Sequence, residues 1–536
     1  MGMKKAILPL ALLVAAAWPS DACTNIIVGK KASADGSVFC SYNCDTFGHT
    51  GWLTQSPAGR HGPGEKIAIT NFWHPGEIKG YIDQVPQTYS VIGYMNEHQL
   101  TILETTFGGR EELHNPEGML GYDNLMQLAL QRCRTAREAI LEMARLADEY
   151  GYCDEGETFT VCDPDEAWVM DLIGKGPGRK GAVWVAVRIP DDCITAHANH
   201  SRIRTFPQAK KADRKTGVFE VPGVCMYSRD VISFAREMGY FDGADADFSF
   251  REAYCPLEFV NMRLCEPRVW SVFRHHTSAE YMDSFLPYID GKFDECDALP
   301  LWIKPDKKLT LQDVMADMRD HFEGTPLDMT VGVDAGPWSS PIRPRAKGFT
   351  SEGKKYFRER PISTQQAGFA VVAQMRSSVP GGFGGVYWFN CDDPSMMAYV
   401  PVYCTNTEIP EAFKDIHNRD GEFDEGGAFW LLNWVSNMVY PRYSAMMPDL
   451  IEARSELESS FFAQQADVEA MAAAMPAEAR IPYLNAKTAE YTATMMERWK
   501  KLAHHLIVRY NDQPGGWDQQ FYDAVARDTG DRFLVR

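Results

Sequence analysis

The sequence predicts an α+β protein in which strand-rich and helix-rich stretches follow one another in blocks. Three observations carry this prediction. Residues 23–106 contain short runs rich in Ile, Val and Thr, residues 122–150 have apolar side chains at helical spacing, and strand-like runs return after that stretch. Blocks of this kind favour a layered α+β domain over a regular alternation of strands and helices.

The first block is predicted to form hairpins of one layered sheet. The runs TNIIVG and VFCSYN are separated by the turn ADGS at Ala34–Ser37, and a longer run, TYSVIGYMNEHQLTILETTF, turns at Asn96 and Glu97. Asp-Gly and Asn tolerate the backbone conformations of tight turns, and the residues on either side favour strands.

The remaining elements follow from the same patterns. A helix pair is predicted over residues 122–150, with apolar positions that include Leu125, Leu128 and Ile140. Strands are predicted over 157–174, around a turn at Asp163, and over 182–190. Residues 202–328 contain helical pieces such as VISFAREMGY without a linker. Further buried strands over 362–376, 384–393 and 397–403 are expected to rejoin the first sheet, and residues 447–511 have helical spacing with little strand character.

The overall composition is that of a globular protein with a large core. The chain has 536 residues, of which 45% are hydrophobic and 24% charged, and its net charge is -19. This acidic balance argues against a nucleic-acid partner and against attachment to an anionic membrane surface.

The first 22 residues read as a secretion signal. Lys4 and Lys5 precede an apolar run that ends at Trp18, and Ser20 and Ala22 stand at the small-residue positions of a cleavage site. The apolar run is too short to span a bilayer comfortably, so we expect a protein that is exported to the periplasm or the exterior and does not span the membrane. Cleavage after Ala22 would make Cys23 the first residue of the mature chain.

A terminal cysteine has chemistry of its own. Its α-amine, with a reference pKa of about 7.7 to 8, stands beside a thiol of about 8.5, so that nucleophile and base belong to one residue. Two other interpretations of Cys23 are a structural cysteine near a cleavage site and an acylated cysteine that anchors the protein to lipid. Ser20 and Asp21 count against acylation, because that modification prefers an aliphatic residue three positions before the cysteine.

Other catalytic arrangements find little support. The thirteen cysteines are scattered without CxxC spacing, and we expect most to be buried thiols, with a few bridges allowed by export. His197 and His200 give an HxxH spacing, but there is no HExxH motif and no acidic ligand set, so a zinc peptidase is not predicted. The PGGFGG run lacks the Lys and Ser/Thr of a phosphate loop, and there is no GxSxG elbow.

The residues after Cys23 decide between the interpretations. The run CTNIIVGKKASADGS closely resembles the start of the Cys-dependent dipeptidase family of the N-terminal-nucleophile (Ntn) hydrolases. The resemblance continues to Tyr443 through GYMNEHQLTILETTFGGR, LQRCRTAREAI, VWVAVRIPDD, HANHSRI, HFEGTPLDMT and ISTQQAGFAVVAQMRS. It implies a four-layer αββα sandwich with helical additions, formed by a catalytic domain over residues 23–446, with a helical extension over 447–536 packed on it.

The resemblance also implies site residues. Relatives in the wider superfamily have an Arg and an Asp about twenty residues after the nucleophile; here Asp45 matches the Asp, and Tyr42 replaces the Arg. Asn199 matches an oxyanion-site Asn, and Thr106 replaces another site Asn of bile-salt-hydrolase-like relatives. Each also has a plain structural interpretation: Asp45 as a turn residue and Asn199 as a loop residue that caps backbone groups.

A dipeptide presents an ammonium and a carboxylate at once, so its site needs an acidic and a basic group. Glu104 and Arg110 are assigned to these roles and, with Tyr42 and Thr106, form the predicted substrate-binding set; Cys23, Asp45 and Asn199 form the catalytic set. The predicted function is an exported cysteine dipeptidase that forms a thioester on Cys23 and needs no metal or organic cofactor; an oligomer is compatible with the sequence. The alternatives are an Ntn amidase for bile-salt or penicillin-type amides and a lipid-anchored peptide-binding protein without enzymatic activity.

Overall fold

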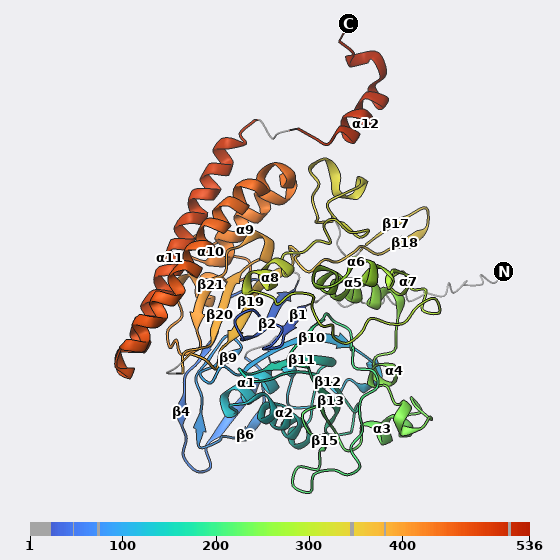
Figure 1. Cartoon of the computed structure of the whole chain (residues 1–536), viewed down its shortest axis with the longest axis vertical. Coiled ribbons are helices and arrows are strands. Elements are labelled where there is room, and N and C mark those ends of the chain that lie inside the picture. Colours follow the sequence, from blue (N-terminus) through green and yellow to red (C-terminus); the bar gives the residue numbers. More distant parts are fainter. Residues whose placement is uncertain are drawn as a thin grey trace, which may run out of the picture.

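The computed structural model of the chain is a mixed helix and sheet structure (Figure 1). It describes residues 23–46, 48–71, 76–343, 348–379, 382–512 and 516–535. The predicted secretion signal, residues 1–22, lies outside the described residues.

A six-stranded antiparallel sheet contains the first strand of the described chain. Its order is β14-β1-β2-β19-β20-β21. Strand β1 is second from one edge of the sheet and pairs antiparallel with β14 on one side and β2 on the other. The strand bounds are β1 Thr24–Val28, β2 Val38–Asp45, β14 Ile194–His197, β19 Ala367–Met375, β20 Val386–Cys391 and β21 Val400–Tyr403.

A second, nine-stranded sheet has the order β15-β16-β13-β12-β11-β10-β9-β8-β3. Strands β10 to β13 are its long centre, and almost every residue in them is buried. The bounds are β3 Gln55–Ser56, β8 Val91–Ile92, β9 Met95–Asn96, β10 Thr101–Gly108, β11 Gly156–Cys162, β12 Ala167–Gly174, β13 Ala182–Arg188, β15 Phe219–Val221 and β16 Cys225–Tyr227.

The division into two sheets corrects the sequence-based expectation for the first block. Strands β1 and β2 form a hairpin, as predicted, but β8, β9 and β10 belong to the nine-stranded sheet. The prediction that the later strands rejoin the first sheet is confirmed: β19 pairs with β2 from Met375↔Val38 to Ala367↔Asp45, and β20 and β21 continue the same sheet. Short-range turn signals identified the hairpins, but not which sheet each strand would join.

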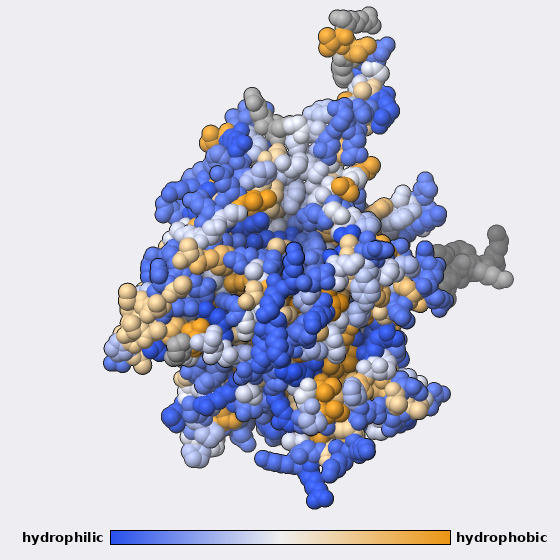
Figure 2. Space-filling view, in the orientation of Figure 1, coloured by the Kyte–Doolittle hydropathy of each residue, from blue (hydrophilic) through white to orange (hydrophobic). Residues whose placement is uncertain are grey.

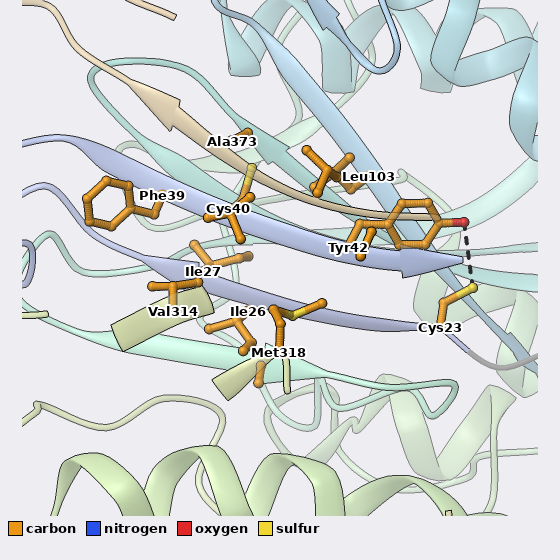
Figure 3. Close-up of a cluster of buried hydrophobic side chains, with 14 of the residues drawn as sticks. Cys23, Ile26, Ile27, Phe39, Cys40, Tyr42, Leu103, Val314, Met318 and Ala373 are labelled. Atoms are coloured by element: carbon orange, nitrogen blue, oxygen red, sulfur yellow. Dashed lines mark hydrogen bonds between the residues drawn. The ribbon is translucent and has the colours of Figure 1, made fainter. Parts of the chain in front are cut away.

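The two sheets lie against each other near β1, β2 and β10. Apolar side chains from both sheets meet there in one buried cluster, which includes Ile27 and Tyr42 of the first sheet and Leu103 of the second (Figure 3). Cys23 lies at the end of this cluster, so the predicted nucleophile is placed by the packing of one sheet on the other.

Helices cover the outer side of each sheet (Figure 1). Helices α1 (Tyr122–Arg132) and α2 (Ala136–Tyr150) form the predicted pair and share a separate apolar cluster with the nine-stranded sheet. Helices α9 (Ala428–Val439), α10 (Tyr443–Ala474) and α11 (Ala477–Arg509) lie beside β20 and β21. The predicted domain boundary after residue 446 falls inside α10.

Shorter elements complete the described chain. The remaining strands form the two-stranded sheets β4 (Gly59–Arg60) with β7 (Gln87–Thr88), β5 (Lys66–Thr70) with β6 (Ile78–Asp83), and β17 (Phe349–Ser351) with β18 (Lys354–Tyr356). The remaining α-helices are α3 Val231–Glu237, α4 Phe250–Tyr254, α5 Phe259–His276, α6 Ala279–Asp283, α7 Leu286–Ile289, α8 Leu311–Asp317 and α12 Gln519–Thr529. The 3-10 helices are η1 Glu111–Leu113, η2 Asp245–Asp247, η3 Val333–Trp338, η4 Pro394–Met396, η5 Glu411–Phe413, η6 Asp415–His417, η7 Tyr440–Arg442 and η8 Gly530–Phe533.

The surface view in Figure 2 shows a largely hydrophilic face with scattered apolar residues. Among the residues that the structure describes, no helix is both long enough and apolar enough to cross a membrane. All thirteen cysteines belong to the described residues and are free thiols, and eleven of them are buried while Cys44 and Cys296 are partly exposed.

Candidate active site

Cys23 lies immediately before β1, where the two sheets meet. Its side chain is buried, with 6% of the residue exposed. The Sγ atom is 3.6 Å from the hydroxyl of Tyr42 on β2 (Figure 3). It is 3.7 Å from Oε1 of Glu104 on β10. The Tyr42 hydroxyl also donates a hydrogen bond to Glu104 Oε1. The structure therefore brings together three residues that the sequence analysis assigned to the site from separate segments.

The backbone nitrogen of Cys23 has a fixed partner in Asn199. It donates a 2.7 Å hydrogen bond to Asn199 Oδ1, and Asn199 Nδ2 donates a 2.8 Å bond to the carbonyl of Thr106. Asn199 follows β14 and adopts a left-handed backbone with φ 49°, a region that Asn tolerates better than most residues. Asn199 and Thr106 thus join the site, and Asn199 positions the nitrogen that cleavage after Ala22 would turn into a free amine.

Arg268 was missed by the sequence analysis. It comes from α5, and its Nη1 donates to the Cys23 carbonyl and to Thr24 Oγ1, each at 2.8 Å, while its Nη2 is 3.3 Å from Asn199 Oδ1. The side chain is fully buried. A planar guanidinium with several donors suits this task, because it bonds three groups at once. Arg268 thus holds the Cys23 carbonyl directly and the Cys23 nitrogen through Asn199.

Asp45 ends β2 and is completely buried. Its Oδ2 atom is 3.6 Å from the guanidinium of Arg360, a second cation that sequence reasoning did not assign. Burial lowers the pKa of Arg360 to about 10, and the charges of Asp45 and Cys23 oppose that effect. A cation near the nucleophile is therefore present although Tyr42 replaces the expected Arg. This cation is Arg360, which belongs to a distant segment of the chain.

The surroundings disfavour the thiolate of Cys23 in the resting site. Burial raises the pKa of the Cys23 thiol well above its ordinary value, and a hydrogen bond with Cys44 and the negative charges of Glu104 and Asp45 raise it further. A protonated thiol is a weak nucleophile, so the site needs a base within reach of Sγ.

Thr106 connects the site to a second buried carboxyl group. Its Oγ1 donates a 3.0 Å hydrogen bond to Oε2 of Glu157 on β11. Arg110 lies elsewhere: its Nε donates a 2.6 Å bond to the carbonyl of Ala253, and its guanidinium covers the ring of Tyr240 at 3.9 Å. These contacts do not bring Arg110 to Cys23.

The missed residues differ in the signal they leave in the sequence. Glu157 is the second residue of β11, and a charged residue in a fully buried strand is a recognisable exception. Arg268 and Arg360 have no such signal, because only the tertiary fold brings them to Cys23. Asn43, whose Oδ1 accepts a 2.6 Å bond from the Thr24 nitrogen, also escaped notice.

His197 is a structural residue by its contacts. Its Nδ1 lies 2.7 Å from Thr105 Oγ1 and its Nε2 lies 2.7 Å from Thr160 Oγ1, so both ring nitrogens are engaged. Burial lowers its pKa to about 3, which keeps the ring neutral at physiological pH. Within the described part of the chain, no group of three or more His, Cys, Asp or Glu side chains is arranged to hold a metal ion.

Comparisons with known proteins agree in pointing to one family. The sequence matches the model of peptidase family C69 over residues 22–56 and 59–456. It is 24% identical over 440 residues to a probable dipeptidase of Latilactobacillus sakei, covering 79% of this chain and 82% of the relative. It is 24% identical over 403 residues to a probable dipeptidase of Salmonella dublin (71% and 81%). It is 25% identical over 437 residues to a probable dipeptidase B of Lactococcus lactis subsp. lactis (76% and 79%).

Proposed function

Because the chain belongs to peptidase family C69 and is therefore a cysteine-type peptidase, we propose that it is an exported dipeptidase whose mature form begins with the nucleophile Cys23. The observation that carries this proposal is the position of both reactive atoms of Cys23. Its nitrogen is held 2.7 Å from Asn199 Oδ1, and its Sγ lies beside Glu104 and Tyr42. The relatives named probable dipeptidases support the substrate class.

The free amine of a processed Cys23 would be the base that the protonated thiol requires. The amine accepts the thiol proton, directly or through water, and the thiolate attacks the peptide carbonyl. The protonated amine then gives its proton to the leaving amino acid, which departs as the amine product and leaves a thioester on Cys23. Water attacks the thioester, the amine again accepts a proton, and the second amino acid is released.

Asn199 is the proposed oxyanion donor. A side-chain amide has two N–H groups, and one of them is used by the Thr106 carbonyl. The other is the candidate donor to the oxyanion of the tetrahedral intermediate. In a serine protease of known mechanism, one such donor lowers the activation barrier by about 2.7 to 4 kcal/mol.

Glu104 is proposed to receive the ammonium group of the dipeptide, because it is the acidic side chain in contact with the nucleophile. The structure offers no support for Arg110 as the carboxylate partner. Arg360 replaces it in the proposal, since its charge acts on Cys23 and it is anchored by Asp45.

Two further parts of the proposal concern fold and location. We propose the four-layer αββα arrangement of the Ntn hydrolases; the contact between the two sheets and the helices on their outer sides support it. Export is supported by Lys4, Lys5 and the apolar run in residues 1–22, followed by the small residues Ser20 and Ala22.

The test uses protein that begins at Cys23, compared with the Cys23→Ala variant, which keeps a terminal amine but lacks the thiol. We expect the first to hydrolyse dipeptides and the second to fold and show no hydrolysis. Cys133→Ala, which removes a buried thiol in the separate apolar cluster beneath α1 and α2, is the matched control and should retain activity. Persistent hydrolysis by Cys23→Ala would overturn the mechanism.

A substrate panel tests the assignment of substrate. Dipeptides with free termini are compared with the same dipeptides acetylated at the amine or amidated at the carboxyl group. We expect blocking of either end to abolish cleavage. Equal cleavage of free and blocked substrates would instead indicate an amidase that recognises an acyl-amine bond alone.

A further inference from the structure

Two buried carboxyl groups lie side by side next to the nucleophile. Glu104 on β10 faces Phe159 of β11 across the sheet, and Thr106 faces Glu157. Glu104 and Glu157 are therefore diagonal neighbours, two positions apart, with side chains on the same face of the sheet. Glu104 is 3% exposed and Glu157 is 0% exposed, so water does not screen either group.

The placement and burial of this pair favour a shared proton. Tyr42 donates to Glu104 and Thr106 donates to Glu157, and the two carboxyl groups are diagonal neighbours on the same face of the sheet. Two ionised carboxylates are acceptors only, so these two groups can bond to each other only when one of them holds a proton. Burial and the charge of Glu104 raise the pKa of Glu157 well above its ordinary range, which is the behaviour of two carboxyl groups that cannot both ionise.

We propose that Glu157 is a positioning residue for the peptidase reaction, because it shares one proton with Glu104 and thereby sets the negative charge that faces the Cys23 thiol. The inference rests on the proposed role of Cys23 as nucleophile. Glu157 itself does not contact Sγ among the described contacts; it acts through Glu104, whose Oε1 lies 3.7 Å from Sγ.

The shared proton limits the charge beside the thiol. With the proton in place the pair carries one negative charge, and after its loss the pair carries two. Each negative charge disfavours the thiolate, so loss of the shared proton makes Cys23 harder to ionise. The other titratable groups facing the pair are a third carboxyl group, that of Asp154, and thiols and phenols, which carry no charge while protonated: Cys23, Tyr42, Cys44, Tyr94, Tyr122 and Tyr152.

The variant Glu157→Gln removes the titrating proton while preserving shape. The Gln amide can donate to Glu104 and accept from Thr106, so Glu104 stays ionised with one constant charge. The rate of Cys23 alkylation by iodoacetamide, located by peptide mass spectrometry, reports the thiolate fraction from pH 6 to pH 10. Because the wild-type pair gains its second charge as pH rises, we expect the ratio of variant to wild-type rate to increase with pH, to about tenfold for one pKa unit.

A matched control is Asp171→Asn, which changes another buried carboxyl group, on the neighbouring strand β12. Asp171 accepts hydrogen bonds from Thr158 and Ser201 and has no described contact with Glu104. Its rate ratio should not vary with pH. A ratio for Glu157→Gln that is equally flat would overturn the proposal and leave Glu157 a structural residue.

Two measurements keep the outcome interpretable. If Glu157→Gln does not fold, Glu104→Gln breaks the same pair from the other strand, and its rate ratio should also rise with pH; a flat ratio again counts against the proposal. Dipeptide hydrolysis is followed during alkylation of the wild-type protein. Hydrolysis that survives complete alkylation of Cys23 refutes the nucleophile itself, whereas hydrolysis lost together with a flat ratio refutes only the role of Glu157.

Discussion

The backbone nitrogen of Cys23 donates a 2.7 Å hydrogen bond to Oδ1 of Asn199, and the two residues are separated by 176 positions in the sequence. This bond fixes a nitrogen that is a peptide amide in the uncut chain and would be an amine after cleavage at Ala22. The acceptor is held by its own bond to Thr106 and by Arg268. The fold thus holds this nitrogen in a geometry that would suit an amine base before the proposed cleavage.

Asn199 is expected to have two roles: it positions the Cys23 nitrogen, and it donates a hydrogen bond to the oxyanion. Asn199→Ala should lower kcat by about 100- to 1000-fold if the amide donates to the oxyanion. Asn199→Asp keeps an acceptor for the Cys23 nitrogen but removes the amide donors, so it separates the two roles. Steady-state kinetics on a dipeptide checks this: a near-normal kcat for Asn199→Asp would show that Asn199 only positions the amine.

Arg268 is expected to be needed for both stability and turnover. Arg268→Gln leaves the buried Cys23 carbonyl and the Thr24 hydroxyl without their donor, which costs about 1 to 3 kcal/mol for an unsatisfied buried group. The free energy of unfolding, measured with urea, and kcat/KM should both decrease. Arg274→Gln, on the same helix but in a partly exposed pair with Asp283, is the control and should cost less than about 1 kcal/mol. Equal effects of the two changes would contradict the prediction.

Asp45 and Arg360 are expected to shift the pKa of the Cys23 thiol in opposite directions. The charge of Asp45 raises the pKa of the Cys23 thiol, whereas the guanidinium of Arg360 attracts the thiolate. Asp45→Asn should therefore speed alkylation of Cys23 at neutral pH, and Arg360→Gln should slow it. A shift of one pKa unit would correspond to about tenfold in rate. Changes in the same direction would show that both residues act through packing.

The last helix is expected to be dispensable for stability. Helix α12 has no buried residues, and Asp518 just before it bonds to Ser339 on the surface. The free energy of unfolding of a chain that ends at residue 512 should lie within about 0.5 kcal/mol of that of the full chain. Trp499→Ala in α11 removes a fully buried side chain and should cost about 3 to 5 kcal/mol. Thermal unfolding of the three proteins checks the order.

Local patterns were enough to predict most elements that surround the site. The turn at Ala34–Ser37 connects β1 and β2, and the helical spacing of residues 122–150 corresponds to α1 and α2. These predictions succeed because turn chemistry and apolar periodicity act over a few residues. Helix α5 was not identified as one element, and Pro267 in its interior weakens the pattern.

The site was only partly predictable for a physical reason. The fold brings together Cys23, Tyr42 and Asn199, which the sequence analysis assigned to the site, because Cys23 contacts both of the others. Arg268 is 245 positions from Cys23, and no local signal encodes a contact between them. The thiol environment was also missed, because a pKa depends on burial and on charges that only the folded chain assembles.

His197 is expected to make stability depend on pH without taking part in the reaction. Its pKa is about 3 in the folded protein and about 6.5 when unfolded, so between these values the unfolded chain binds more protons. Its contribution to stability is therefore complete above about pH 6.5 and is lost as pH falls toward 3. His197→Gln should reduce the slope of the unfolding free energy against pH by up to about 1.4 kcal/mol per unit between pH 4 and 6. Urea unfolding at several pH values measures this slope, with the exposed His504→Gln as control. An unchanged slope for His197→Gln would mean that the buried ring titrates in the folded protein, and that its bonds to Thr105 and Thr160 do not hold it neutral.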